Sequence, residues 1–197
     1  MLIVVGLTGG IASGKSFVSS YLKKISIPVH ESDEVIKHIY NKPTQAFISF
    51  LRKAGFGYAV KNKKINKTNI REEIFCDKNK KNIIEKHLHA KVRKSREVFL
   101  NKNKNKKIIF LDIPLLFEKK LEKNCHYVCS TIAPLETRKA RAMNRFGMNK
   151  QILKKIIKSQ IKDIERKKKS DFIIDTSRSK IKTCLQIDKI IYDILNI

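Results

Sequence analysis

A glycine-rich segment near the start of the chain has the residue types and spacing that bind phosphate groups. Residues 9–16 read GGIASGKS and fit the pattern G-x-x-x-x-G-K-[ST], between an apolar run and a helical pattern. Glycines let the backbone curl so that its N–H groups face phosphate oxygens, and the following helix start adds partial positive charge. We expect Lys15 to bridge the β- and γ-phosphates of a bound ATP and Ser16 to hold Mg²⁺.

A chance glycine turn is the alternative to this phosphate-binding loop, called the P-loop below. Because Gly and Lys each make up roughly 6 to 7% of residues, a random match in a chain of this size is expected in well under about 1% of cases. The P-loop, the residue after it and two later arginines form the predicted nucleotide site: Gly10, Ile11, Ala12, Ser13, Gly14, Lys15, Ser16, Phe17, Arg141 and Arg145.

Two aspartates follow short apolar runs, where the carboxyl ends of parallel strands place ligand-binding groups. Asp112 ends the run at 107–111 and is expected to act on Mg²⁺, directly or through water. Asp33 follows the run at 27–30 by a few residues and could orient an attacking hydroxyl and accept its proton. The alternatives are a strand-end acid without function for Asp112 and a helix N-cap for Asp33.

Three arginines are spaced so that a single helix would place them on one face. Arg138, Arg141 and Arg145 stand at i, i+3 and i+7, and planar guanidinium groups suit phosphate binding. They predict a mobile lid that closes over the triphosphate and shields it from water, with Arg145 among the catalytic residues. An exposed basic face is the alternative.

The surrounding pattern predicts an α/β fold with a five-stranded parallel sheet. Short runs rich in β-branched residues, without alternation, occupy residues 2–7, 27–30, 108–111, 127–132 and 172–174. Helical spacing occupies residues 15–24, 33–101, 135–145, 150–168 and 180–195. We expect a nucleotide-binding core at 1–32, 107–134 and 170–197, a helical insertion at 33–106 that caps the carboxyl edge of the sheet, and a lid with its following helix at 135–169.

Composition limits the remaining possibilities. A chain of 197 residues with 42% hydrophobic content can bury the core of one ordinary domain. The formal net charge of +26 would attract polyanions, but the lysines are spread along the chain, which favours a general surface bias over a specific nucleic-acid site. The cysteine spacing is typical of reduced thiols, and no apolar run reaches the length that spans a bilayer. We expect a cytoplasmic protein, with a monomer favoured.

These segments together resemble the dephospho-CoA kinases over essentially the whole chain. The most specific part is DIPLLFE at residues 112–118. Further similar positions are Ile74-Phe75, Leu88-His89, Glu136-Thr137 before Arg141 and Arg145, Gln160, and the run SDFIID at 170–175.

The resemblance implies a P-loop kinase fold with a helical substrate-binding insertion and a lid. It also implies that ATP, with Mg²⁺, phosphorylates the 3′-hydroxyl of dephospho-CoA, giving coenzyme A and ADP in the last step of coenzyme A synthesis. The implied catalytic residues are Asp33 as the base, Lys15 and Arg145; the implied substrate contacts are Asp33, His89, Leu115 and Phe117; the implied metal-site residues are Ser16 and Asp112.

The chain departs from the family pattern at several positions. Ala12 stands where glycine is usual, Phe17 where threonine is, and Thr176 where asparagine is. We expect these changes to affect ATP affinity rather than the type of reaction. A nucleoside or nucleotide kinase of the same fold is the alternative function, and a basic nucleic-acid-binding protein is a more distant one.

Overall fold

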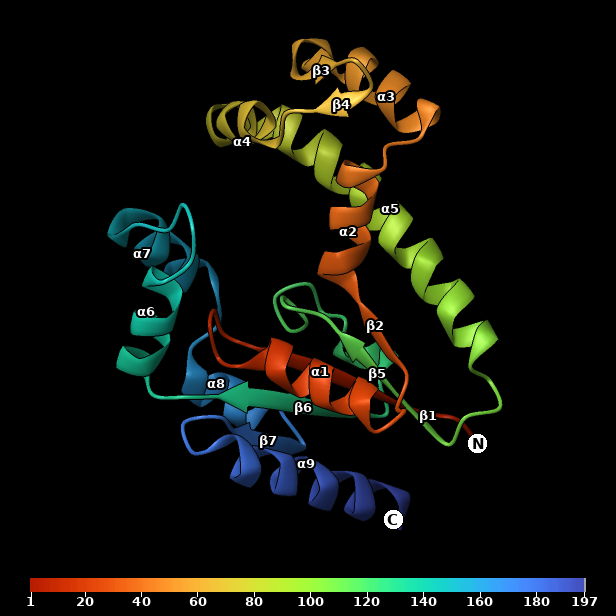
Figure 1. Cartoon of the computed structure of the whole chain (residues 1–197), viewed down its shortest axis with the longest axis vertical. Coiled ribbons are helices and arrows are strands. Elements are labelled where there is room, and N and C mark those ends of the chain that lie inside the picture. The colour runs from red at the N-terminus through yellow and green to blue at the C-terminus, as the bar shows by residue number, and fades with distance from the viewer. Residues whose placement is uncertain (197) are drawn as a thin grey trace. The chain divides into compact units, whose positions relative to one another are not determined.

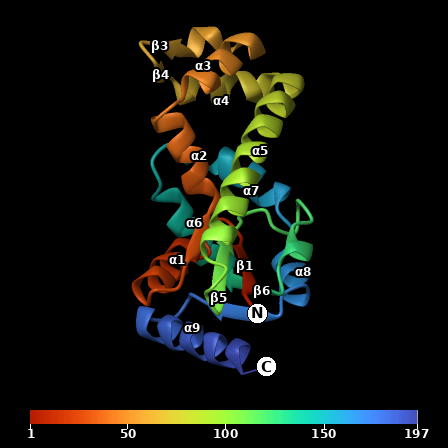
Figure 2. The same cartoon turned by 90° about the vertical axis from the view of Figure 1, so that its right-hand side faces the viewer.

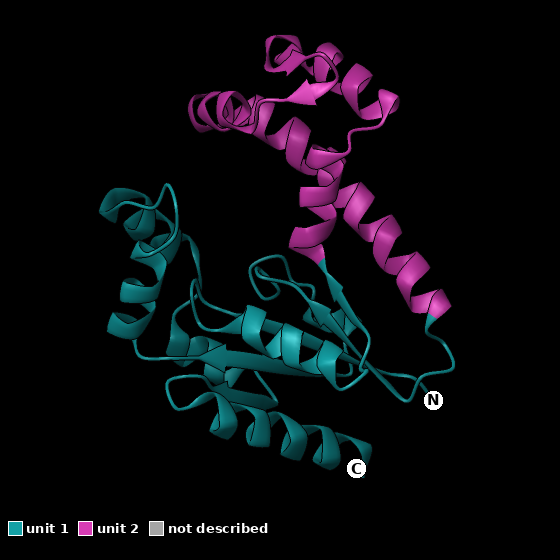
Figure 3. Cartoon of the chain, viewed as in Figure 1, with its two compact units in different colours: residues 1–31, 103–197 teal, residues 32–102 magenta. Residues whose placement is uncertain are grey.

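The computed structural model describes residues 1–196, which divide into two units (Figure 3). The core unit consists of residues 1–31 and the chain from residue 103 onward. The inserted unit is Ser32–Lys102. The sequence placed the insertion at 33–106, so the structure returns the chain to the core unit a few residues earlier.

A five-stranded parallel sheet forms the centre of the core unit, and the prediction of such a sheet is confirmed (Figure 1). The strand order is β2-β5-β1-β6-β7. Apolar, mostly β-branched residues favour strands that helices cover on both faces. The strands are β1 (Ile3–Gly9), β2 (Val29–Glu31), β5 (Ile108–Asp112), β6 (Tyr127–Ile132) and β7 (Phe172–Asp175).

Two helices, α1 (Lys15–Lys24) and α9 (Lys180–Leu195), pack against one face of this sheet. They lie side by side in Figures 1 and 2. Buried residues at helical spacing, such as Val18 and Leu22 on α1 and Ile187 on α9, join the strand side chains in one apolar cluster. The ranges predicted for these two helices coincide with those observed.

The helix predicted at 135–145 ends at residue 143, and the helix predicted at 150–168 is interrupted. They form α6 (Leu135–Met143), α7 (Lys150–Ser159) and α8 (Asp163–Lys168). After α6 the chain turns at Gly147, whose φ of 73° favours glycine. After α7 the backbone is extended at Gln160 and Lys162. This extended link, Gln160–Lys162, separates α7 from α8.

The inserted unit is mainly helical and has its own apolar core. Side chains from its helices and from the turn after α3, among them Phe47, Phe56 and Ile84, form one buried cluster. A two-stranded antiparallel hairpin, β3 with β4, lies within the range of helical spacing predicted at 33–101. The elements are α2 (Ser32–Asn41), α3 (Gln45–Leu51), a π-helical turn (Arg52–Phe56), a 3₁₀ turn (Gly57–Ala59), β3 (Val60–Lys61), β4 (Lys64–Ile65), α4 (Lys67–Cys76) and α5 (Lys78–Lys102).

Among the helices formed by residues 1–196, none combines the length and apolar character needed to cross a membrane.

Candidate active site

The P-loop joins the end of β1 to the start of α1, as the sequence predicts. Gly14 precedes the helix with a φ of 88°, in the left-handed region that glycine adopts without strain. Its carbonyl accepts the N–H groups of Phe17 and Val18, so the first turn of α1 begins at the loop itself. The residue at 14 is also restricted sterically, because a Cβ there would lie 2.7 Å from Thr176 Oγ1.

Ala12 occupies a strained position in this loop. Its φ is 57°, in the left-handed region where a side chain is disfavoured. The glycine that the family usually has at this position would carry no such cost. Ala12 is buried in a small apolar cluster with Ala142 of α6 and Leu153 of α7, against which Ile11 also packs.

A charged pair connects the P-loop helix to the end of β5, the strand next to β1. Lys15 Nζ forms an ion pair with Asp112 Oδ1, and Ser19 Oγ donates to Asp112 Oδ2 at 2.7 Å. Asp112 is only 5% exposed, so both of its carboxylate oxygens have partners in a largely desolvated position. The lysine of the P-loop is therefore held by an internal carboxylate.

The position of Asp112 follows from the sheet register. As the last residue of β5, it lies opposite Leu7 of β1 and Glu31 of β2. Ser16 lies one residue after Lys15 in the first turn of α1, and its side chain is exposed. Both residues offer oxygen atoms, the ligand type that Mg²⁺ prefers.

Two threonines fix the P-loop from neighbouring strands. Thr131 Oγ1 lies 2.6 Å from Ser13 Oγ and donates to the carbonyl of Thr8. Thr176 Oγ1 donates to the carbonyl of Ser13 at 2.8 Å, from the residue directly after β7. Sequence reasoning noted Thr176 only as a departure from the family and did not select Ser19 or Thr131. The spacing of Lys15 and Ser19, four residues apart, was the available signal for a shared partner.

The three arginines at 138, 141 and 145 do not share one helical face, so this part of the lid prediction is wrong. Arg138 is 5% exposed and forms an ion pair with Asp163 of α8. Arg141 donates to the carbonyl of Thr176 at 2.8 Å and to its hydroxyl at 3.1 Å. Arg145 is exposed and lies beyond the end of α6. The physical reason is that the helix ends at Met143.

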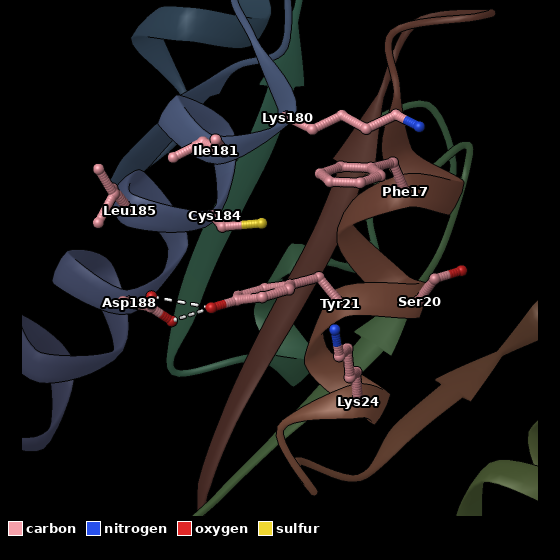
Figure 4. Close-up of a pocket in the computed structure, with 9 residues that line it drawn as sticks. All are labelled: Phe17, Ser20, Tyr21, Lys24, Lys180, Ile181, Cys184, Leu185 and Asp188. Atoms are coloured by element: carbon pink, nitrogen blue, oxygen red, sulfur yellow. Dashed lines mark hydrogen bonds between the residues drawn. The ribbon is translucent and has the colours of Figure 1, made fainter.

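Phe17 points away from the P-loop into a groove between α1 and α9 (Figure 4). In this view its ring lies beside the aliphatic chain of Lys180. One turn further along α1, Tyr21 donates to Asp188 at 2.8 Å, and this hydrogen bond, together with burial and the charge of Asp188, raises the pKa of Tyr21 to about 12. The groove has a volume of about 470 Å³.

The segment after β5 contains two of the predicted substrate contacts. Leu115 is half-buried, whereas Phe117 is only 6% exposed. The segment is fixed to β1, because Ile113 N donates to the carbonyl of Leu7 and Thr8 Oγ1 donates to that of Pro114.

The other two predicted substrate contacts belong to the inserted unit. Asp33 is exposed in the first turn of α2, as the second residue of that helix. A base that faces the acceptor hydroxyl and a helix N-cap both remain predictions for Asp33. His89 is exposed on α5. The structure brings Lys15 and Asp112 together in the core unit, and Asp33 and His89 remain predictions.

Comparison with known proteins gives a consistent result. The dephospho-CoA kinase family model matches residues 3–182. The chain is 34% identical over 195 residues to the dephospho-CoA kinase of Bartonella quintana, with 98% of each chain covered. It is 35% identical over 180 residues to that of Fusobacterium nucleatum, covering 89% of this chain and 90% of the relative.

The solved structures agree with these sequences. The dephospho-CoA kinase of Campylobacter jejuni superposes with a TM-score of 0.72 at 29% identity, over 100% of this chain and 98% of that one. Because the family model matches most of the chain and relatives above 30% identity align over nearly its full length, this chain belongs to the dephospho-CoA kinase family.

Proposed function

We propose that this chain transfers the γ-phosphoryl group of ATP to the 3′-hydroxyl of dephospho-CoA, giving coenzyme A and ADP. The observation that carries the proposal is the convergence of Lys15, Ser19 and Asp112 at the end of a P-loop, in a chain of the dephospho-CoA kinase family. The proposal places this reaction in the cytoplasm, with the chain acting as a monomer.

Lys15 is the proposed phosphate-binding cation. Its partner Asp112 is a buried carboxylate, so the ammonium group is retained in a poorly solvated site before nucleotide arrives. On binding ATP, Lys15 exchanges this carboxylate for phosphate oxygens. Its charge then stabilises the negative charge that spreads over the transferring group.

Ser16 and Asp112 are the proposed residues for Mg²⁺. Within residues 1–196 no group of three or more His, Cys, Asp or Glu side chains is arranged to hold a metal. The two oxygen donors of Ser16 and Asp112 fit Mg²⁺, which usually takes one or two protein oxygens with nucleotide phosphates and waters. When bound, the ion neutralises charge between the β- and γ-phosphates.

Arg141 and Arg145 are proposed to contact the nucleotide phosphates. Arg145 is exposed, whereas Arg141 would first have to release its hydrogen bond to the carbonyl of Thr176. Asp33 is proposed to orient the acceptor hydroxyl and receive its proton. His89, Leu115 and Phe117 are proposed to contact dephospho-CoA. For the buried Phe117, such a contact requires the segment after β5 to move.

The test is ADP formation from ATP and Mg²⁺ with dephospho-CoA, adenosine or AMP as the acceptor. Of these three acceptors, we expect only dephospho-CoA to be phosphorylated. ³¹P NMR of the product should show the new phosphate at the ribose 3′ position. A reaction without acceptor measures background hydrolysis. Equal or faster turnover of adenosine or AMP would instead support a nucleoside or nucleotide kinase of the same fold.

A further inference from the structure

The link between α7 and α8 makes a direct contact with the backbone of the P-loop. Gln160, the first residue of this link, accepts the N–H of Ile11 through its side-chain carbonyl at 2.9 Å. Ile11 precedes the strained Ala12, whose φ is 57°. Gln160 therefore holds the peptide group at the start of the strained turn.

The turn needs such support because a left-handed alanine is disfavoured against other backbone conformations. Apolar contacts supply part of it. Ala12 is 7% exposed and packs with Ala142 and Leu153, while Met148 and Ile157 cover the same cluster. The hydrogen bond from Ile11 to Gln160 is the polar part of the same contact.

A buried charged cluster fixes the link itself. The N–H of Ile161, next to Gln160, donates to Glu118 Oε1 at 3.0 Å. Arg166 is 1% exposed and lies between two carboxylates, with Nη1 2.6 Å from Asp163 Oδ1 and Nη2 3.6 Å from Glu118 Oε1. Asp163 also binds Arg138.

The cluster also touches the P-loop. A Cβ at Gly10 would collide with the guanidinium group of Arg138. Contacts with the segment after β5 and with α8 thus hold the link that carries Gln160, in addition to its contact with the P-loop.

We propose that Gln160 is a positioning residue of the phosphate site, which keeps the strained turn at Ile11 and Ala12 in the conformation that receives the triphosphate. It does not contact the reacting atoms in this proposal. The proposal rests on the proposed ATP-dependent function, but two of its three readouts, the Kd of MgATP and the exchange of the Ile11 amide, need only ATP binding. A chain that bound ATP and did not phosphorylate dephospho-CoA would leave it intact.

The decisive variant is Gln160→Met, which keeps the length of the side chain and removes the acceptor. The matched control is Gln151→Met, the same change at an exposed position on α7. Three quantities are measured for the full chain: the Kd of MgATP by calorimetry, kcat at saturating ATP, and the exchange rate of the Ile11 amide by NMR.

We expect Gln160→Met to raise the Kd of MgATP about five- to tenfold, the upper value corresponding to about 1.4 kcal/mol, and to accelerate Ile11 exchange. Saturating ATP selects the ordered loop, so kcat should stay within about twofold. Gln160→Glu, which keeps an acceptor, should retain slow exchange at Ile11. Gln151→Met should change none of the three.

Ala12→Gly gives an independent measurement of the strain. Glycine adopts the left-handed turn without the steric cost, so the Kd penalty of Gln160→Met should be smaller in that background. An unchanged Kd and unchanged Ile11 exchange in Gln160→Met would overturn the proposal. So would an equal loss in Gln151→Met, or a fall in kcat without a change in Kd.

Discussion

The two units of the chain are stabilised by different kinds of interior. In the core unit, polar side chains are buried around the P-loop and paired with one another: Ser13 with Thr131, Asp112 with Lys15 and Ser19, and Thr176 with the carbonyl of Ser13. In the inserted unit, Ser32–Lys102, all of whose residues are described, no polar or charged residue is buried to the same degree.

This difference predicts how each unit responds to substitution. A buried polar group that loses its partner carries a desolvation cost, so changes at the nucleotide site should affect both folding and activity. The proposed substrate residues Asp33 and His89 are exposed, so changes there should affect activity alone.

The largest expected effect is that of Lys15→Ala, which tests the core unit. We expect kcat to fall by about 10³-fold, because the charge that stabilises the transferring phosphoryl group is lost. We also expect a lower Tm, because the carboxylate of Asp112, only 5% exposed, loses its cation. Steady-state kinetics and thermal unfolding measure the two effects.

The control for Lys15→Ala is Lys23→Ala on the same helix. It removes the ion pair between Lys23 and Glu31, in which the lysine is 48% exposed, so kcat should be unchanged and Tm nearly so. Near-normal turnover in Lys15→Ala would remove this lysine from the mechanism. An unchanged Tm would contradict the contrast between the units.

Asp33→Asn is expected to have the next largest effect and tests the inserted unit. The change keeps shape and one acceptor oxygen but removes the charge that receives the proton. We expect kcat to fall by about 10²-fold, with the Kd of MgATP and the Tm little changed, because Asp33 is exposed.

Glu34→Gln removes the same charge from the same turn of α2 and should leave kcat unaltered. It therefore separates a specific role of Asp33 from a general electrostatic effect. Retained turnover in Asp33→Asn would exclude Asp33 as the base, and a large loss of MgATP affinity would assign it to the nucleotide site.

Local sequence signals were sufficient for the parallel sheet, the P-loop and the two helices that pack beside it. The strand-end position of Asp112 could be predicted because a parallel sheet aligns strand ends. The apolar spacing of α1 and α9 fixed their ranges because one face of each packs on the sheet.

Contacts between distant segments could not be predicted in the same way. The hydrogen bond of Gln160 to Ile11 joins residues 149 positions apart, and no spacing within one element encodes it. The prediction of one arginine face failed for Arg145 because i, i+3, i+7 spacing describes a helical face only while the helix continues, and α6 ends at Met143. It failed for Arg138 because this residue is buried in an ion pair with Asp163, 25 positions along the chain. The hairpin of β3 and β4 was missed because each strand has only two residues.

The smallest expected effect concerns His87, a histidine packed against aromatic rings of the inserted unit. Its ring stacks on Phe50, with 3.8 Å between centroids, and lies 5.6 Å from Phe47. Burial, and to a smaller extent the charge of Lys91, lowers the pKa of His87 below its usual value.

Below the unfolded-state pKa of about 6.5, the unfolded chain binds the additional proton, so stability is lost as the pH falls from 7 towards 5. His87→Phe keeps the stacked ring and cannot be protonated. Between pH 7 and pH 5 we therefore expect the Tm of this variant to fall roughly 2 °C less than the Tm of the unmodified chain. The exposed His38 provides the control, because His38→Gln should leave the acid-induced loss of Tm unchanged. An equal loss in His87→Phe and the unmodified chain would show that His87 does not couple the inserted unit to pH, and the contrast with the charge-paired core unit would then rest on the Lys15 and Asp33 variants.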